Sequence, residues 1–392
     1  MLPSPLADEA YEHARYLVEE IGPRGSTTPQ EHQAAEYYSN RLHELGLDVK
    51  AQTFSSPKSA WTPMGLCMLL SLFSLLLSLL GELFVYFSLV LSLAAIYWAL
   101  REVNLDDTLL NRLLSLGKSE NRWAKILPRE EKKASVVLLG HLDSHRTPLI
   151  MQSRFFSTIF TVFSILGYTS LVAVPIYLAG RVLSLWGNYL PFTPVIVIIQ
   201  GILSALILQA DFTRYSPGAN DNAAAVGMVL ACARYYKNQP LKNTEIILLA
   251  SGCEEVGCYG MRRYLDQYRA EVKEARFIDY ELIGRGLPTV TVREGLLFKQ
   301  KCDEELAEIS NNACRQTGIP MRRNESQVYG EGYVINKQGF AGITLTADPE
   351  GKPDVYWHTP RDTMDKLDKA TLAMMFNWTK NILEEIDRAA HS

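Results

Sequence analysis

Two long blocks of apolar residues constrain the fold of this chain more than any other feature. Residues 64–100 are almost continuously apolar, and a second block runs from about Phe155 to Ala210. Each block is too long for one membrane-spanning helix and about right for two, because a span needs roughly 20 apolar residues. The pattern predicts four transmembrane helices in two hairpins, Pro63–Leu80, Leu83–Leu100, Phe155–Leu178 and Leu190–Leu208.

Core helices of a large soluble domain are the alternative to membrane spans. The apolar residues of these segments surround each helix instead of forming one stripe, which favours the membrane. Two hairpins return the chain to its starting side, so all polar segments should face one aqueous compartment. Positive charges flank the spans on that side, and their bias predicts a multi-pass protein with its polar part in the cytoplasm. These charges are Lys58, Arg101, Arg146, Arg154 and Arg214, against only Arg181 at the tips.

The remaining sequence alternates between strand-like and helix-like segments. Such alternation predicts an α/β fold, a mainly parallel mixed sheet flanked by helices in an α/β/α sandwich. Strands are expected at Leu47–Phe54, Ser135–Leu139, Glu245–Ala250, Arg276–Tyr280 and Gly342–Leu345. Helices are expected at 5–21, 29–45, Asn222–Lys237, Gly260–Arg269, Asp303–Thr317 and Lys369–Arg388.

The apolar blocks divide this α/β sequence into three pieces. Residues 1–60 would form its N-terminal part, 61–100 the first hairpin, 101–154 its continuation, 155–210 the second hairpin and 211–392 its remainder. The formal net charge of -4, without a basic stripe, argues against nucleic acid as a partner. None of the six cysteines forms a CxxC pair, so ordinary thiols are expected.

Polar groups capable of chemistry stand at the ends of the predicted strands. His141-Leu142-Asp143 and Glu254-Glu255 directly follow buried strands, and Asp279 ends another. Asp221 precedes a helix, and His358 lies near the C-terminus. In α/β folds the functional groups gather at the carboxyl ends of the strands. Each of these residues has an ordinary structural explanation on its own, but their joint occurrence at strand ends favours a functional site.

The same motifs resemble those of the M28 family of zinc aminopeptidases. Similar segments are Glu20-Ile21-Gly22-Pro23-Arg24, His141-Leu142-Asp143, Gly218-Ala219-Asn220-Asp221-Asn222, Ala250 through Gly257, Glu331 through Leu345, and His358 with Asp362-Thr363. The resemblance covers the polar sequence and none of the apolar blocks. It implies a zinc-peptidase fold and a peptide substrate. Glu331 departs from it, since the family typically has Asp there.

The resemblance implies two zinc ions per chain and a role for each site residue. Asp221 would bridge the ions, with His141 and Asp279 completing one and Glu255 and His358 the other. Glu254 would be the general base. Asp143 would hold the ring of His141. His145, a further nearby imidazole, is expected to be a loop residue without a catalytic task.

About 80 residues separate His141 from Asp221, more than the family usually has, because the second apolar block lies between them. This insertion predicts catalysis close to a bilayer surface and a preference for apolar or membrane-associated peptides. A simple anchor is the alternative.

Other functions stay open on this sequence. A carboxypeptidase would need a cation near the metals, for which Arg285 and Arg293 are candidates. A glutaminyl cyclase-like enzyme would use one zinc. A metal-free receptor or scaffold should have lost ligands, and a transporter should carry charges along its spans. The sequence predicts neither the oligomeric state nor the preferred peptide.

Overall fold

The computed structural model describes residues 5–186, 192–349 and 355–391, and the chain separates into two compact units. The sheet unit comprises Met1–Ser56, Gly117–His145 and Tyr215–Ser392. The helical unit comprises Pro57–Leu116 and Arg146–Arg214.

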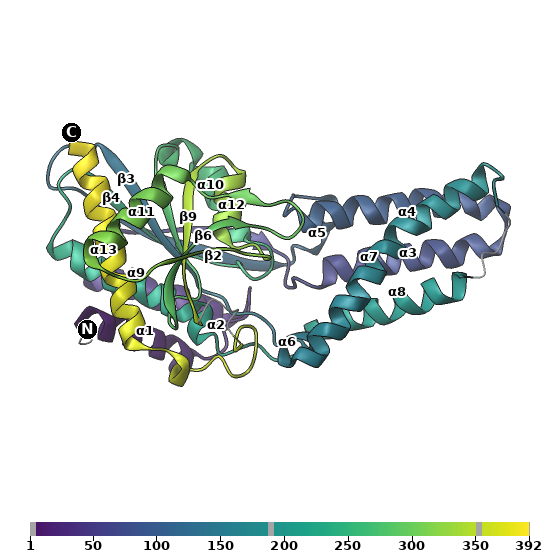
Figure 1. Ribbon diagram of the computed structural model, residues 1–392, viewed down its shortest axis with the longest axis horizontal. Coiled ribbons are helices and arrows are strands. Elements are labelled where there is room, and N and C mark those ends of the chain that lie inside the picture. The colour runs from purple at the N-terminus through teal and green to yellow at the C-terminus, as the bar shows by residue number, and fades with distance from the viewer. Residues whose placement is uncertain (1–4, 187–191, 350–354, 392) are drawn as a thin grey trace. The chain divides into compact units, whose positions relative to one another are not determined.

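A mixed sheet forms the centre of the sheet unit (Figure 1). Its strands follow the spatial order β1-β2-β4-β3-β5-β9-β6-β7, and β8 pairs with β6. The neighbours β4, β3, β5 and β9 are parallel, whereas β1, β2 and β6 join this core antiparallel. The strands are β1 (Val49–Ser56), β2 (Gly117–Ile126), β3 (Ala134–His141), β4 (Thr244–Ser251), β5 (Arg276–Tyr280), β6 (Leu287–Glu294), β7 (Gln300–Lys301), β8 (Arg322–Glu325) and β9 (Ala341–Asp348).

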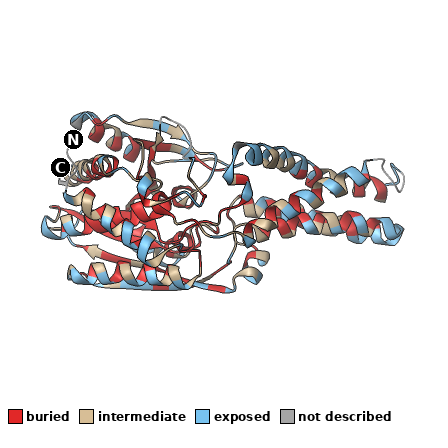
Figure 2. Ribbon diagram, turned by 90° about the horizontal axis from the view of Figure 1, so that it is seen from below, coloured by how far each residue is buried: buried red, intermediate tan, exposed pale blue. Residues whose placement is uncertain are grey.

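Helices cover both faces of this sheet, which confirms the predicted α/β class (Figure 1). On one face lie α1 (Pro5–Arg15), α2 (Pro29–Glu44), α9 (Ala224–Asn238), α11 (Glu304–Thr317) and α13 (Lys369–His391). On the other face lie α10 (Tyr259–Val272) and α12 (Glu331–Lys337). The parallel strands and α9 are almost wholly buried (Figure 2), as their continuous apolar sequences require.

Four of these strands are not predicted by the sequence pattern, β2, β6, β7 and β8. The polar first half of β2 hides this strand, because buried polar side chains such as Asn121 are satisfied by hydrogen bonds while only its second half packs apolar residues in the core. Asn121 of β2 donates from Nδ2 to Oε1 of Gln52 and to the carbonyl oxygen of Gly260, both at 2.8 Å.

The helical unit contains four helices, among the described residues, that are long and apolar enough to cross a membrane. These segments are Thr62–Leu80, Glu82–Val103, Phe155–Val182 and Thr193–Phe212. They are built from α3 (Thr62–Leu77) with the turn η2 (Ser78–Leu80), α4 (Glu82–Val103), α7 (Arg154–Val182), and α8 (Thr193–Leu208) with the turn η3 (Gln209–Phe212). The start predicted for the fourth span, Leu190, lies outside the described residues.

Several polar side chains of the helical unit are buried between its helices, and many large apolar side chains lie on its outer surface. Gln200 donates to the hydroxyl of Ser71 at 3.0 Å, and both are fully buried. The buried guanidinium of Arg181 binds the Ser78 carbonyl at 2.8 Å and Glu82 at 3.2 Å. Large side chains such as Leu83 and Val90 are exposed. Buried polar side chains together with an apolar outer surface suit a helical unit that is surrounded by lipid.

Candidate metal centre

Three neighbouring parallel strands deliver the site residues to one edge of the sheet. His141 is the last residue of β3, Glu254 and Glu255 follow β4, and Glu281 follows β5. Because β4, β3 and β5 are adjacent and parallel, their carboxyl ends meet. Asp221 comes from the irregular turn η4 (Ala219–Ala223) before α9, and the peptide bond that follows it is cis.

Asp221 lies between two histidines. Its Oδ1 is 3.2 Å from Nε2 of His141, and its Oδ2 is 3.1 Å from Nε2 of His358. A second carboxylate accompanies each imidazole, since Oε2 of Glu281 is 3.3 Å from His141 and Oε2 of Glu255 is 3.2 Å from His358. The arrangement is two groups of nitrogen and oxygen donors that share one aspartate.

Glu281, which no sequence motif singled out, lies in the position beside His141 that was expected for Asp279. Oδ2 of Asp279 instead accepts hydrogen bonds from the Gly332 amide at 3.0 Å and the Thr344 hydroxyl at 3.1 Å. Asp279 belongs to none of the metal-binding groups among the described residues, whereas Glu281 groups with His141 and Asp221. We therefore revise the predicted ligand set from Asp279 to Glu281. The available signal was the spacing, because Glu281 lies two residues beyond Asp279 and so projects from the same face.

The Glu254-Glu255 loop is held by Asp143. The Asp143 carboxylate accepts hydrogen bonds from the amides of Glu254 at 3.0 Å and Glu255 at 3.2 Å, and from the hydroxyl of Ser26 at 2.6 Å. Nδ1 of His141 lies 3.0 Å from the Asp143 carbonyl oxygen and 3.5 Å from its carboxylate. Asp143 thus contacts the imidazole of His141 and also holds the backbone of the two adjacent glutamates.

Glu254 lies in the same site but farther from His141 than the other carboxylates are from their histidines. Its Oε2 is 4.0 Å from Nε2 of His141, and its Oε1 is 3.2 Å from the thiol of Cys258. Cys253 and Cys258, on either side of the loop, form no disulfide, and neither do the other four cysteines, all of which are described.

Two buried ionic side chains position the loop that carries Asp221. The Asp362 carboxylate accepts from the amides of Asn220 at 2.8 Å and Asp221 at 3.0 Å. Arg24 donates to the carbonyl oxygens of Leu142 at 3.0 Å and Gly218 at 2.8 Å, tying this loop to the end of β3. Burial lowers the pKa of Arg24 to about 10, against the pull of Asp362 and Asp143.

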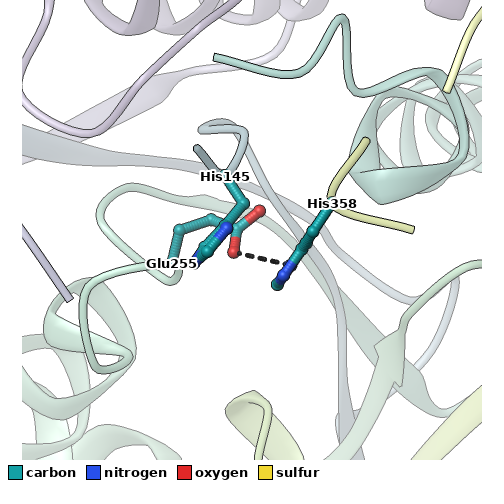
Figure 3. A group of neighbouring side chains, drawn as sticks. All are labelled: His145, Glu255 and His358. Carbon is teal, nitrogen blue, oxygen red and sulfur yellow. Dashed lines mark ion pairs between the residues drawn. The ribbon is translucent and has the colours of Figure 1, made fainter. Parts of the chain in front are cut away.

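His145 stacks on His358, with ring centroids 3.7 Å apart (Figure 3). Figure 3 shows both imidazoles beside Glu255, and the three side chains form a further group able to hold a metal. His145 was expected to be a nearby loop residue without a catalytic task, and the structure adds that its ring packs against that of His358.

Carboxylates crowd this site beyond what its imidazoles can balance. Burial raises the pKa of Glu254 and Glu255 well above the usual value, and their negative neighbours add to this. Burial also raises the pKa of Glu281 to about 7 and that of Asp279 to about 6. Burial alone would lower the pKa of His141, but Glu281 and the other facing carboxylates raise it overall. The shifts indicate a site that lacks positive charge.

The donor atoms fit a metal cation. Nε2 of His141 and Oε1 of Glu255 are buried and form no well-aligned hydrogen bond within the described chain, although two carboxylates lie 3.2 and 3.3 Å from that nitrogen. Buried polar atoms are normally paired, so such orphans call for a ligand. Imidazole nitrogen with carboxylate oxygen is the donor set that zinc prefers.

An open cavity of about 510 Å³ adjoins these residues. Its lining includes the site residues Asp221, Glu254, Glu255, Glu281 and His358. Strand β8 and residues 326–330 contribute further lining. A pocket of this size accommodates a few residues of peptide.

Known proteins resemble this chain in sequence and in fold. The model of peptidase family M28 matches residues 204–383. Aminopeptidase YwaD of Bacillus subtilis is 25% identical over 167 residues, which cover 41% of this chain and 36% of that protein. The matched part is therefore about a third of the relative's length.

Solved structures of the same fold cover nearly the whole chain. A zinc aminopeptidase from Bacillus subtilis, BSAP, superposes with a TM-score of 0.59 at 16% identity, covering 97% of this chain and 94% of that one. A glutaminyl cyclase from Bacteroides thetaiotaomicron gives a TM-score of 0.57 at 16% identity, with coverages of 96% and 97%.

Proposed function

We propose that this chain, whose residues 204–383 match the model of peptidase family M28, is a zinc-dependent exopeptidase that acts as an aminopeptidase. The observation that carries the proposal is the position of Asp221, whose two carboxylate oxygens each face a different histidine. A shared aspartate of this kind suits a pair of cations. The relatives named aminopeptidase support the activity.

Five side chains would hold the two zinc ions. Asp221 would serve both, His141 and Glu281 would complete one, and Glu255 and His358 the other. When bound, zinc supplies a Lewis acid that lowers the pKa of a water molecule and polarises the scissile carbonyl.

Glu254 is the general base in this proposal. It lines the cavity, and its carboxylate lies apart from the close histidine contacts that Glu255 and Glu281 make. Glu254 would take a proton from the attacking water and return it to the leaving amine. Asp143 keeps Glu254 in place through its backbone amide.

The proposal includes integration into a membrane through the four apolar helices. Their length, their hydropathy and the exposed apolar side chains of the helical unit support it. The positive residues that flank the spans support a cytoplasmic sheet unit. Protease protection in sealed vesicles tests this: cytoplasmic placement predicts cleavage of the sheet unit only where the cytoplasmic face is outside.

Zinc analysis combined with peptide hydrolysis tests the activity. Two zinc ions per chain and turnover abolished by a chelator are expected. Glu254→Gln should retain its zinc and lose about 10²- to 10⁴-fold in kcat. Glu304→Gln, at an exposed site on α11, is the control and should leave turnover unchanged. A Glu254→Gln protein as active as wild type would refute the assigned base.

Substrate chemistry separates the remaining enzyme classes. An aminopeptidase cleaves a peptide with a free α-amine and leaves its N-acetylated form intact. A glutaminyl cyclase, the class of one structural neighbour, would cyclise N-terminal glutamine and contain one zinc. Cyclisation with a single bound ion would replace the aminopeptidase proposal.

A further inference from the structure

We propose that Arg322 binds a carboxylate group of the peptide substrate, at the end of the cavity opposite the candidate metal centre. The inference rests on the proposed peptidase function and narrows its substrate class. Arg322 lies on β8, lines the cavity and is half-buried. Its chemistry and its position in the sheet support this assignment.

The guanidinium of Arg322 has an unsatisfied hydrogen-bond donor within the described part of the chain. Its charge acts on the nearby Asp348 carboxylate, but it forms no hydrogen bond or close ion pair with a described residue, and its Nη1 is buried without a partner. The neighbouring Arg323 is exposed and pairs with Glu308 at 3.3 Å, as a surface arginine ordinarily does. Such a guanidinium in a cavity wall can bind a carboxylate. It donates two parallel hydrogen bonds to the two carboxylate oxygens.

The sheet register places Arg322 in a row of neighbouring residues that runs across the strands and starts at Glu281. The Glu281 amide donates to the Leu345 carbonyl oxygen at 3.1 Å, next to Thr346 of β9. Thr346 pairs with Thr289 of β6, and Thr289 pairs with Arg322 of β8. Directly opposed residues share a face of the sheet, so this row runs from the metal end of the cavity to Arg322.

The number of strands in this row sets the distance. From β5 to β8 are three strand spacings of about 4.8 Å, or roughly 14 Å between backbones. One residue of an extended peptide spans at most about 3.6 Å. The bound carboxylate therefore lies several residues from the scissile bond, which differs from a carboxypeptidase, where the residue after the scissile bond carries it.

The charges at the two ends of the cavity match those of a short peptide. Acidic side chains, among them Glu281 and Glu294, line the metal end, where an N-terminal ammonium would be attracted. Arg322 and Arg323 supply positive charge to the other end, where Glu325 and Asp348 also line the cavity. Glu325 forms ion pairs with Lys299 and Arg293, and Asn324 donates to Asp348. The carboxylate can belong to the C-terminus of a short peptide or to an acidic side chain, and the chemistry at Arg322 is the same for both.

Equilibrium binding to zinc-loaded, full-length Glu254→Gln protein tests the inference without turnover. The probes are alanine peptides of two to six residues, each as free acid and as C-terminal amide. A second set of C-terminally amidated peptides carries either Glu or Gln at each position after the first. Tighter binding of the Glu member shows that the carboxylate belongs to a side chain. Calorimetry should show about ten- to a hundredfold tighter binding of the carboxylate-bearing member of a pair, at one length or position.

Variants at Arg322 decide the outcome. In the same background, Arg322→Gln should abolish the preference and Arg322→Glu should reverse it toward the amide. Arg276→Gln, which removes an ion-paired arginine from β5 outside the cavity lining, is the matched control and should keep the preference. No preference in the parent protein, or one that survives both Arg322 variants, overturns the proposal.

These results are independent of the proposed activity. If wild-type protein hydrolyses no peptide, the peptidase proposal fails, yet an Arg322-dependent preference in binding would still establish the subsite. If hydrolysis occurs and no preference exists, only the subsite fails.

Discussion

Asp362→Asn tests whether the loop that carries Asp221 is held in place for metal binding. Asp362 is buried and accepts from two consecutive backbone amides, those of Asn220 and Asp221. An asparagine side chain has one acceptor oxygen and one donor nitrogen, so it can accept from only one of them as Asp362 does. The other amide would face a donor and stay unsatisfied in a buried site.

The loss amounts to one hydrogen bond to a charged group, which contributes about 1.5–3 kcal/mol. If most of this free energy serves to hold Asp221 in its metal-binding position, its loss lowers zinc affinity about ten- to a hundredfold. Competition against a fluorescent zinc chelator measures this affinity. Thermal unfolding of the chelator-treated protein, measured separately, shows how much the substitution lowers the stability of the metal-free fold.

Asp365→Asn provides a matched control in the same segment. Asp365 is exposed and contacts Lys366 and Thr363 without reaching the site. Its substitution should leave zinc affinity unchanged. If Asp362→Asn binds zinc as tightly as the Asp365→Asn control, Asp362 does not position Asp221 for the metals and our account of the loop is wrong.

Three further predictions follow from the same structure. Glu281→Gln should leave one zinc per chain by metal analysis, whereas Asp279→Asn should leave two, and the opposite result would restore Asp279 as the ligand. Trp378→Ala should destabilise the sheet unit by about 3–5 kcal/mol in denaturant unfolding, because this fully buried side chain also donates to the Ser310 carbonyl at 2.8 Å. Metal-free protein should lose stability as pH rises from about 5 to 8, since carboxyls with a raised folded pKa keep protons that the unfolded chain releases in this window. Thermal unfolding with and without zinc measures this, and a flat metal-free profile would contradict pKa values of about 8, 6, 7 and 8 for Glu31, Asp279, Glu281 and Glu294.

Sequence patterns predict the buried parallel strands well because apolar runs such as Glu245–Ala250 leave few alternatives. Pattern reasoning fails at β8, whose sequence Arg-Arg-Asn-Glu contains no apolar residue. This strand exists because β6 offers it a free edge, with Thr289 opposite Arg322. A strand stabilised by a neighbour's backbone leaves no signal in its own composition.

The histidines and acids of the site could be proposed from the sequence because each lies at the end of a predicted element. Their supporting contacts could not. Asp143 reaches the amides of Glu254 and Glu255 across more than 100 residues of sequence. Arg24 joins Leu142 to Gly218 in the same way. Such contacts depend on which loops the sheet order brings together.

The choice between Asp279 and Glu281 shows where local reasoning ends. The two residues are two apart at the end of β5, so both project toward the same edge and the sequence alone does not rank them. Partners from distant segments decide between them. Thr344 and Gly332 occupy the Asp279 carboxylate, while Nδ2 of Asn222 donates to Oε2 of Glu281 at 3.1 Å, the same oxygen that lies 3.3 Å from His141. Ligand identity at this position is therefore a property of the tertiary fold, because it is set by which carboxylate the neighbouring loops leave facing His141.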